Sequence, residues 1–207
     1  MKVAVIVPAY NEEENIGRVL PVVLAAPGID EVIVVSDGSR DRTAAIARSM
    51  GCRVVELACN LGKGGAMMAG ARATEAEVLL FLDADLIGLQ VSHVRALLEP
   101  VVSGQADMTV GVFTDGRLAT DLAQKLAPFL SGQRALRRKL LEDIPDLDRT
   151  GFGVEVAISR YAERARLRVV KVPLDGVAQR IKEEKAGLWR GFRARMRMYW
   201  EILKTVR

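Results

Sequence analysis

One apolar run that ends in two carboxylates constrains this chain more than any other stretch. The run Val78–Leu82 has the length and composition of a strand buried on both faces, as in a parallel sheet. Asp83-Ala84-Asp85 follows directly, and in extended chain the two acidic side chains share one face. They repel each other unless a cation lies between them, and ligands of open α/β sheets bind beyond the carboxyl ends of strands. The stretch predicts a site for Mg²⁺ or Mn²⁺ on substrate phosphates; the alternative is a turn whose aspartates cap the next helix.

Strand-like and helix-like segments alternate along the first half of the chain. Further strands are expected at Val3–Val7, Val32–Val35, Arg53–Leu57 and Met108–Val112. Helices are expected after Asn11 and after Ser39, each acting as an N-cap, and over Ala66–Thr74 and Val91–Val102. This alternation predicts an α/β fold with a doubly wound, mostly parallel sheet flanked by helices.

The regular alternation of strand-like and helix-like segments ends at Gly116. Helical patterns cover Leu118–Leu126 and Ala135–Leu141, a helix is expected after Gly153, a late strand over Arg168–Val172, and a helical C-terminal tail from Ile181. The chain has no internal repeat or low-complexity segment. Its 207 residues therefore predict a single domain, with a nucleotide-binding half at 1–115, an acceptor-side half at 116–180 and a basic tail at 181–207.

Composition and cysteine usage bear on the cellular setting. Cys52 and Cys59 lack the spacing of a metal site and are expected to be free thiols, as in a reducing cytosol. Met1-Lys2 runs straight into the first strand, so we expect no signal peptide, and no apolar run approaches the roughly 20 residues that span a bilayer. A cytoplasmic protein, at most attached to the inner face of a membrane, is expected.

The tail from Leu188 to Arg207 interleaves aromatic residues with arginines. A basic amphipathic helix of this kind can lie on an anionic membrane surface. The alternative is a helix that docks its apolar face on the domain. Nucleic acid is a poorer partner, because the basic residues form no wider patch.

Two polar turns follow other strands at the same predicted rim. Asp37 could accept hydrogen bonds from a ribose hydroxyl or a base N–H, or it could simply build an Asp-Gly-Ser turn. Gly62-Lys63-Gly64-Gly65 fails the phosphate-loop pattern, since neither Ser nor Thr follows the lysine. What is left is a helix N-terminus with one lysine, suited to an anion, or a glycine turn that allows tight packing.

Charged residues of the second half complete the candidates. Arg134 lies at the start of the expected helix 135–141 and is a candidate for contacting phosphate. Glu155 could be a general base, an acceptor-binding carboxylate or simply a favourable first-turn acid. Arg180 and Lys185 could close over a diphosphate, whereas His93, the single histidine, is interpreted as structural.

Four motifs, in order, resemble those of the family 2 glycosyltransferases, which have the GT-A fold. They are Val5–Glu13, Asp37-Gly38-Ser39 with Asp41 and Thr43, Asn60–Gly64, and Asp83-Ala84-Asp85. The resemblance implies that Pro8, Ala9, Tyr10, Glu12 and Asp37 hold the nucleoside of a sugar-nucleotide donor. It also implies that the D-x-D stretch, Ala84 included, holds Mg²⁺ or Mn²⁺ on the diphosphate, with Asp83 and Asp85 as metal residues and Asp85 the direct ligand.

The second half resembles two branches of that family. Ser131–Arg138, Val172-Pro173-Leu174, Arg180 and Lys185 are similar to the polyprenyl-phosphate mannose and glucose synthases, and Gly151–Glu155 to the glucosyl-3-phosphoglycerate synthases. Two positions depart from the family pattern. Ser36 stands where paired acids are usual, and Gln179-Arg180 stands where the phosphoglycerate branch supplies a histidine metal ligand.

The expected activity is a metal-dependent, inverting transfer of a sugar from a nucleotide-sugar donor to a phosphate-bearing acceptor, with a polyprenyl phosphate as the candidate. Asp85, Arg134 and Glu155 are the expected catalytic residues. A glucosyl-3-phosphoglycerate synthase-like enzyme and a catalytically degenerate nucleotide-binding protein are the alternatives. A nucleotidyltransferase would need a basic glycine-rich loop where Pro8–Asn11 stands. A homodimer is left open.

Overall fold

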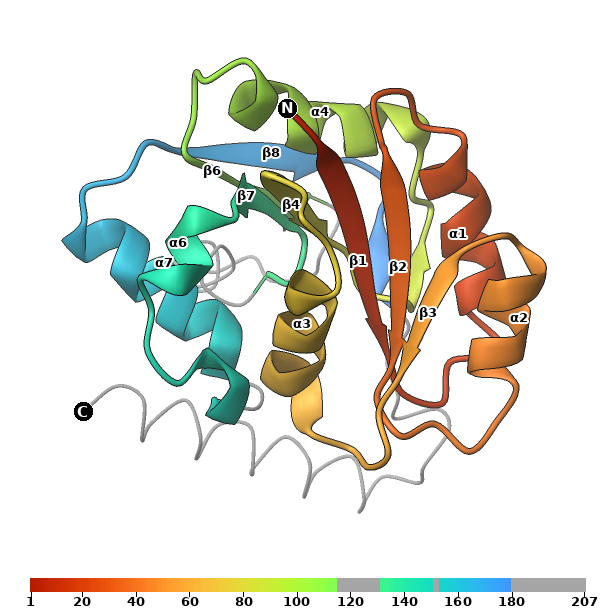
Figure 1. The fold of residues 1–207 in the computed structure, drawn as a ribbon. Helices are drawn as coiled ribbons and strands as arrows, with labels where there is room; N and C mark the ends of the chain where they lie inside the picture. The colour runs from red at the N-terminus through yellow and green to blue at the C-terminus, as the bar shows by residue number, and fades with distance from the viewer. Residues whose placement is uncertain (115–130, 151–152, 180–207) are drawn as a thin grey trace.

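The computed structural model describes residues 1–114, 131–150 and 153–179 of the chain (Figure 1). The expected helix Leu118–Leu126, the residues Arg180 and Lys185, and the tail from Ile181 lie outside the described residues. No helix in the described ranges is long and apolar enough to cross a membrane.

Seven strands within the described residues form one sheet in the order β3-β2-β1-β4-β7-β6-β8 (Figure 1). Their bounds are β1 Val3–Ala9, β2 Glu31–Ser36, β3 Arg53–Glu56, β4 Val78–Phe81, β6 Met108–Phe113, β7 Arg134–Arg137 and β8 Val169–Leu174. Strands β1 to β4 pair in parallel, as do β6 and β8, whereas β7 is antiparallel to both of its neighbours. The expected mostly parallel sheet is confirmed.

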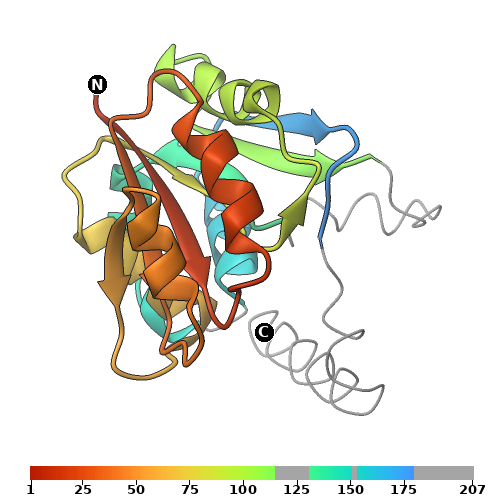
Figure 2. The same ribbon diagram turned by 90° about the vertical axis from the view of Figure 1, so that its right-hand side faces the viewer.

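Helices cover both faces of the sheet, and Figure 2 turns one of these faces toward the viewer. On that face lie α1 (Ile16–Leu24), α2 (Thr43–Ser49) and α4 (Val91–Val102), while α3 (Gly62–Arg72), α6 (Lys139–Glu142), the short 3₁₀ turn η1 (Leu147–Arg149) and α7 (Val154–Arg164) pack on the other.

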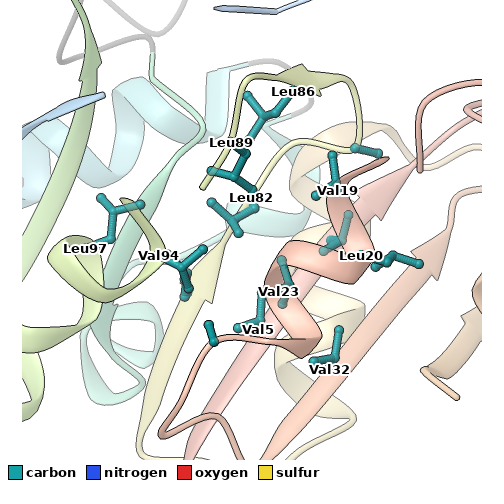
Figure 3. Close-up of a cluster of buried hydrophobic side chains, with 14 of the residues drawn as sticks. Val5, Val19, Leu20, Val23, Val32, Leu82, Leu86, Leu89, Val94 and Leu97 are labelled. Atoms are coloured by element: carbon teal, nitrogen blue, oxygen red, sulfur yellow. The ribbon is translucent and has the colours of Figure 1, made fainter. Parts of the chain in front are cut away.

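Strand β1 shows why its sequence is apolar throughout. Val3, Val5 and Val7 pack in the core cluster beneath α1 and α4, and Ala4 and Ile6 pack in the cluster beneath α3. The alternation is the period of two that a strand imposes. Figure 3 shows the first cluster, in which Val5 lies beside Val23 of α1. A central strand covered on both faces needs apolar residues at every position.

The first two helices begin later than the sequence suggested. Their N-cap residues are Asn15 and Arg42, and not Asn11 and Ser39 as expected. Asn11 has a positive φ of 52°, and α1 begins at Ile16. The Oδ1 atom of Asn11 accepts from the amide of Arg40 (2.9 Å), and the hydroxyl of Ser39 accepts from the amide of Asn11 (3.1 Å). The polar groups of the two loops after β1 and β2 therefore satisfy each other, which holds the two strand ends together.

The expected helix Ala135–Leu141 is wrong. Residues 134–137 form strand β7, inserted between β4 and β6, and the helix that follows, α6, begins only at Lys139. Ala135 and Leu136 are both fully buried but belong to opposite core clusters. Burial on both faces of a sheet outweighs the helical preference of Ala, Leu and Arg, which amounts to only a few tenths of a kcal/mol per residue.

Helix α3 begins at Gly62, four residues before the expected start at Ala66. It packs so closely on the sheet that Gly70 has no room for a side chain. A Cβ at this position would overlap a methyl group of Ile6 and lie 3.0 Å from one of Val35. This close approach sets the height of α3, and of Lys63 at its start, above the sheet.

Gly70→Val is expected to lower the free energy of unfolding by about 2 kcal/mol, because the added methyl groups must push α3 away from β1 and β2. Urea unfolding would measure the loss. The matched control is Ala69→Val, at a half-buried position of the same helix, which should cost only a few tenths of a kcal/mol. Equal losses in the two variants would contradict the packing argument.

Candidate active site

The carboxyl ends of three adjacent strands bring the predicted residues to one rim of the sheet. Pro8 on β1 is opposite Val35 on β2, and Ile6 is opposite Phe81, the last residue of β4. The turns after these strands therefore carry Tyr10, Asp37 and Asp83 at the same edge, where α/β sheets bind ligands.

Asp83 is buried and its carboxylate accepts from three separate segments. Its Oδ1 atom is 2.6 Å from Nζ of Lys63. Its Oδ2 atom accepts from Nε2 of Gln133 (2.8 Å) and from Nε2 of Gln179. Gln179 is brought there by a two-stranded antiparallel sheet that the sequence did not reveal, in which β9 (Ala178–Gln179) pairs with β5 (Leu86–Ile87).

Lys63 lies between two carboxylates. Its Nζ atom is also 2.6 Å from Oε1 of Glu155, the second residue of α7. Only 19% of the lysine side chain and 7% of the glutamate side chain are exposed. Burial disfavours the charged ammonium, but the charges and hydrogen bonds of Asp83 and Glu155 outweigh it and raise the pKa of Lys63 above its ordinary value. The lysine is therefore a permanently charged bridge across the site.

Arg134 is fully buried next to Glu155, one of the two acidic residues paired with Lys63. Its guanidinium donates to the carbonyl of Ser131 (3.1 and 2.5 Å), to the carbonyl of Glu155 (3.1 Å) and to the hydroxyl of Ser159 (3.4 Å). Burial lowers the pKa of Arg134 to about 10, with Glu155 and Asp83 opposing the shift, so the group is charged at neutral pH. The expected helix start at Arg134 is wrong, because Arg134 is the first residue of strand β7, and its contact with a phosphate stays a prediction.

Asp37 caps helix α3. Its two carboxylate oxygens accept from the amides of Leu61 (2.7 Å) and Gly62 (3.0 Å), next to Lys63. Burial raises the pKa of Asp37, and these two amides act in the opposite direction. The described contacts of the Asp37 carboxylate are thus with the start of α3, and not within the Asp-Gly-Ser turn, and a nucleoside contact stays a prediction.

The remaining rim residues differ in exposure. Ala9, Glu12 and Ala84 are buried, whereas 43% of Tyr10 is exposed, and Pro8 and Asp85 are intermediate. The carboxylate of Glu12 accepts from the side-chain amide of Asn15 (2.6 Å). Tyr10 is thus the most exposed of these rim side chains.

His93 has the structural role expected of it. Its Nδ1 atom accepts from the amide of Gln90 (3.2 Å) at the start of α4. The residue takes no part in the cluster around Asp83.

Gly132 and Gln133 were missed as site residues, and Gln179 was noted only as the residue that stands where the phosphoglycerate branch supplies a histidine metal ligand. Gln133 and Gln179 donate to the carboxylate of Asp83, and Gly132 lies so close that a Cβ there would be 2.7 Å from both carboxylate oxygens. The glycine in Ser131-Gly132-Gln133-Arg134 was the available signal, because a buried glycine next to polar residues marks a close approach. Gln133 carries no such signal, and the one for Gln179 came from the family resemblance.

The described part of the chain offers few side-chain ligands to a metal ion. Within the described ranges no group of three or more His, Cys, Asp or Glu side chains is placed to hold an ion. The carboxylates of the D-x-D turn suit a hard divalent cation, but Asp83 already has three donors. The donor set fits Mg²⁺ or Mn²⁺ if Asp85 is the main protein ligand and a substrate supplies most of the others.

A mostly parallel sheet flanked by helices, with acidic side chains at its carboxyl rim, is the architecture expected of a GT-A domain. The model of glycosyl transferase family 2 matches residues 4–161, and the chain belongs to that family.

The chain is similar to two kinds of enzyme. The chain is 30% identical to the glucosyl-3-phosphoglycerate synthase of Mycolicibacterium smegmatis, over 86% of this chain and 67% of that protein. It is 35% identical to the dolichyl-phosphate hexose transferase of Haloferax volcanii, over 82% of this chain and 81% of that protein. The chain spans only 59% of the Mycobacterium tuberculosis phosphoglycerate enzyme.

Solved structures agree with the fold. A crystal structure of the Mycobacterium tuberculosis glucosyl-3-phosphoglycerate synthase with Mn²⁺, UDP-glucose and phosphoglyceric acid matches with a TM-score of 0.74 and 28% identity, over 98% of this chain and 79% of that one. The same enzyme with Mg²⁺ and UDP matches with a TM-score of 0.71 and 29% identity, over 86% and 71%.

Lys63→Met is expected to destabilise the protein by about 3 to 5 kcal/mol, because it leaves two carboxylates buried without their cation. The double variant Lys63→Met/Glu155→Gln should recover part of this loss. Urea unfolding of the single and double variants measures the coupling, which for contacting residues is about 0.5 to 3 kcal/mol. Strictly additive losses would show that the 2.6 Å pair contributes nothing.

Proposed function

We propose that this chain is a metal-dependent glycosyltransferase that moves a hexosyl group from a uridine diphosphate sugar to a phosphate-bearing acceptor. The observation that carries the proposal is the arrangement around Asp83, where the turn that leads to Asp85 is fixed beside the ammonium of Lys63. Carboxylates for a cation and a lysine for phosphate oxygens then meet at one rim. The relatives bound to UDP-glucose support the choice of donor.

Asp85 is the proposed protein ligand of Mg²⁺ or Mn²⁺, together with Asp83 on the same turn. The ion, when bound, neutralises negative charge on the departing nucleoside diphosphate. Lys63 adds a fixed positive charge beside the same phosphates, and because it is already held between two carboxylates it needs no reorganisation to do so.

The nucleoside is proposed to lie along the turn that follows β1. Tyr10 offers an exposed ring for stacking, and Pro8 and Ala9 precede it at the end of β1. Asp37 and Glu12 are both buried and hydrogen-bonded within the protein, so we propose that they act mainly by holding this turn and the start of α3 in place. Ser36, where paired acids are usual, leaves Asp37 as the carboxylate at this position.

A phosphate acceptor fits the charge arrangement better than a hydroxyl acceptor does. A phosphate oxygen is already a nucleophile, whereas a hydroxyl needs a general base. Glu155, the candidate base, has its Oε1 atom in the ion pair with Lys63. We therefore propose that Glu155 positions Lys63 and does not act as a base. Inversion of configuration at the anomeric carbon is a separate prediction, which rests on the family resemblance.

Among phosphate acceptors we propose a polyprenyl phosphate. Among the curated relatives described above, the dolichyl-phosphate hexose transferase is the one whose own length this chain covers most fully, at 81%. A cytoplasmic location with membrane contact through the basic tail, and closure of Arg180 and Lys185 over the diphosphate, belong to this proposal. A phosphoglycerate acceptor, which bears a phosphate but would react through its hydroxyl and so need a general base, is the second candidate, favoured by the solved structures.

Asp85→Ala is expected to weaken Mn²⁺-dependent UDP binding by more than about tenfold, since loss of residues that only support metal ligands already costs 10- to 100-fold. Isothermal titration with UDP, with and without Mn²⁺, measures the effect, and EDTA should reproduce it in the unmodified protein. Asp148→Ala, at an exposed ion pair with Arg72, is the control and should bind normally. Unchanged affinity in Asp85→Ala would remove Asp85 from the site.

The acceptor is tested by supplying UDP-glucose and Mn²⁺ together with undecaprenyl phosphate in detergent or with 3-phosphoglycerate. Radiolabel transferred to the lipid phase supports the polyprenyl phosphate, and label in the phosphoglycerate supports the second candidate. Proton NMR of the product gives the anomeric configuration and tests inversion. UDP binding without transfer to either acceptor would favour the catalytically degenerate alternative.

A further inference from the structure

Asp83 is enclosed by a closed ring of hydrogen bonds and ion pairs. One arm runs from Arg134 through Ser131 and Gln133 to the Oδ2 atom of Asp83. The other runs from Arg134 through Glu155 and Lys63 to the Oδ1 atom. Both arms begin at the same buried guanidinium and end on the same carboxylate.

We propose that Gln133 is a positioning residue for donor and metal binding: its amide fixes the carboxylate of Asp83, and thereby the orientation of the turn that carries Asp85. The inference rests on the proposed function. Gln133 itself touches neither donor nor acceptor in this proposal, because it is fully buried.

The direction of the Gln133 amide is set by its surroundings. Its Oε1 atom accepts from the hydroxyl of Ser131 (3.1 Å), which leaves Nε2 aimed at Asp83 (2.8 Å). The backbone of Gln133 is held as well, since its amide donates to the Ser131 hydroxyl (3.3 Å) and its carbonyl accepts from Gly111 (2.7 Å). Because the backbone and the Oε1 atom of Gln133 are both hydrogen-bonded, its Nε2 donor is held in one position next to Oδ2 of Asp83.

Arg134 makes this arm rigid. Its two bonds to the carbonyl of Ser131 lock the turn before β7, and its bond to the carbonyl of Glu155 ties that turn to the first turn of α7. Arg134, which the sequence suggested as a phosphate ligand, thus stabilises the two segments that position Gln133 and Glu155.

Gly132 shows how little space the ring leaves. A Cβ at this position would be 2.7 Å from each carboxylate oxygen of Asp83. The backbone at Gly132 therefore lies in close contact with the carboxylate of Asp83. Because no free space separates them, we expect that loss of the donor at position 133 changes the position of the Asp83 carboxylate.

The test is Gln133→Met, which keeps the length and volume of the side chain and removes the donor. Affinity for UDP in the presence of Mn²⁺, measured by isothermal titration, is expected to fall 10- to 100-fold, the range for residues that orient metal ligands. The matched control is Thr109→Val. Thr109 is also fully buried and accepts from the amide of Ala135 on β7 (3.3 Å), but it does not touch Asp83. It should lose stability while binding UDP and Mn²⁺ normally.

A double variant tests whether Gln133 acts through Asp83. If it does, Gln133→Met/Asp83→Asn binds no more weakly than Asp83→Asn alone, and the two effects are far from additive. Additive losses, or a Gln133→Met affinity within twofold of the unmodified protein, would overturn the inference.

These outcomes are separate from those of the proposed function. If the unmodified protein binds UDP with Mn²⁺ and Asp85→Ala does not, the proposed site stands whatever Gln133→Met does. If the unmodified protein fails to bind UDP with Mn²⁺, the proposed function fails, and the inference about Gln133 fails with it.

Discussion

The ammonium of Lys63, held 2.6 Å from each of two carboxylates, is the interaction on which the candidate site depends. It joins the start of α3, the end of β4 and the start of α7, segments that are far apart in the sequence. Two negative charges could not be buried side by side without it. The sheet brings the three segments to one rim, and the lysine keeps them there.

Helix α3 positions this lysine through contacts at both of its ends. Asp37 caps its N-terminus, and the missing side chain of Gly70 lets the helix lie close to β1 and β2. The glycine-rich stretch that suggests an anion loop therefore also has a packing role. The two interpretations left open for it are compatible, because the same backbone that packs closely presents Lys63 to the rim.

The first half of the fold could be predicted from the sequence, and much of the second half could not. Strands such as Val78–Phe81 were evident because a run buried on both faces is apolar without interruption. β7 was mistaken for a helix because Ala135 and Leu136 favour a helix locally, and only their burial between β4 and β6 decides otherwise. The contacts of Gln133 and Gln179 with Asp83 could not be predicted, because they join residues 50 and 96 positions apart in the chain.

The pairing of β5 with β9 has a consequence for how Gln179 reaches Asp83. The ladder is only two residues long, with Leu86 opposite Gln179 and Ile87 opposite Ala178. Successive side chains of a strand point to opposite faces, so a slip of one position would turn the methyl group of Ala178 toward the carboxylate and take the amide away. The alignment of one short ladder thus decides whether an amide or a methyl group faces the acidic turn.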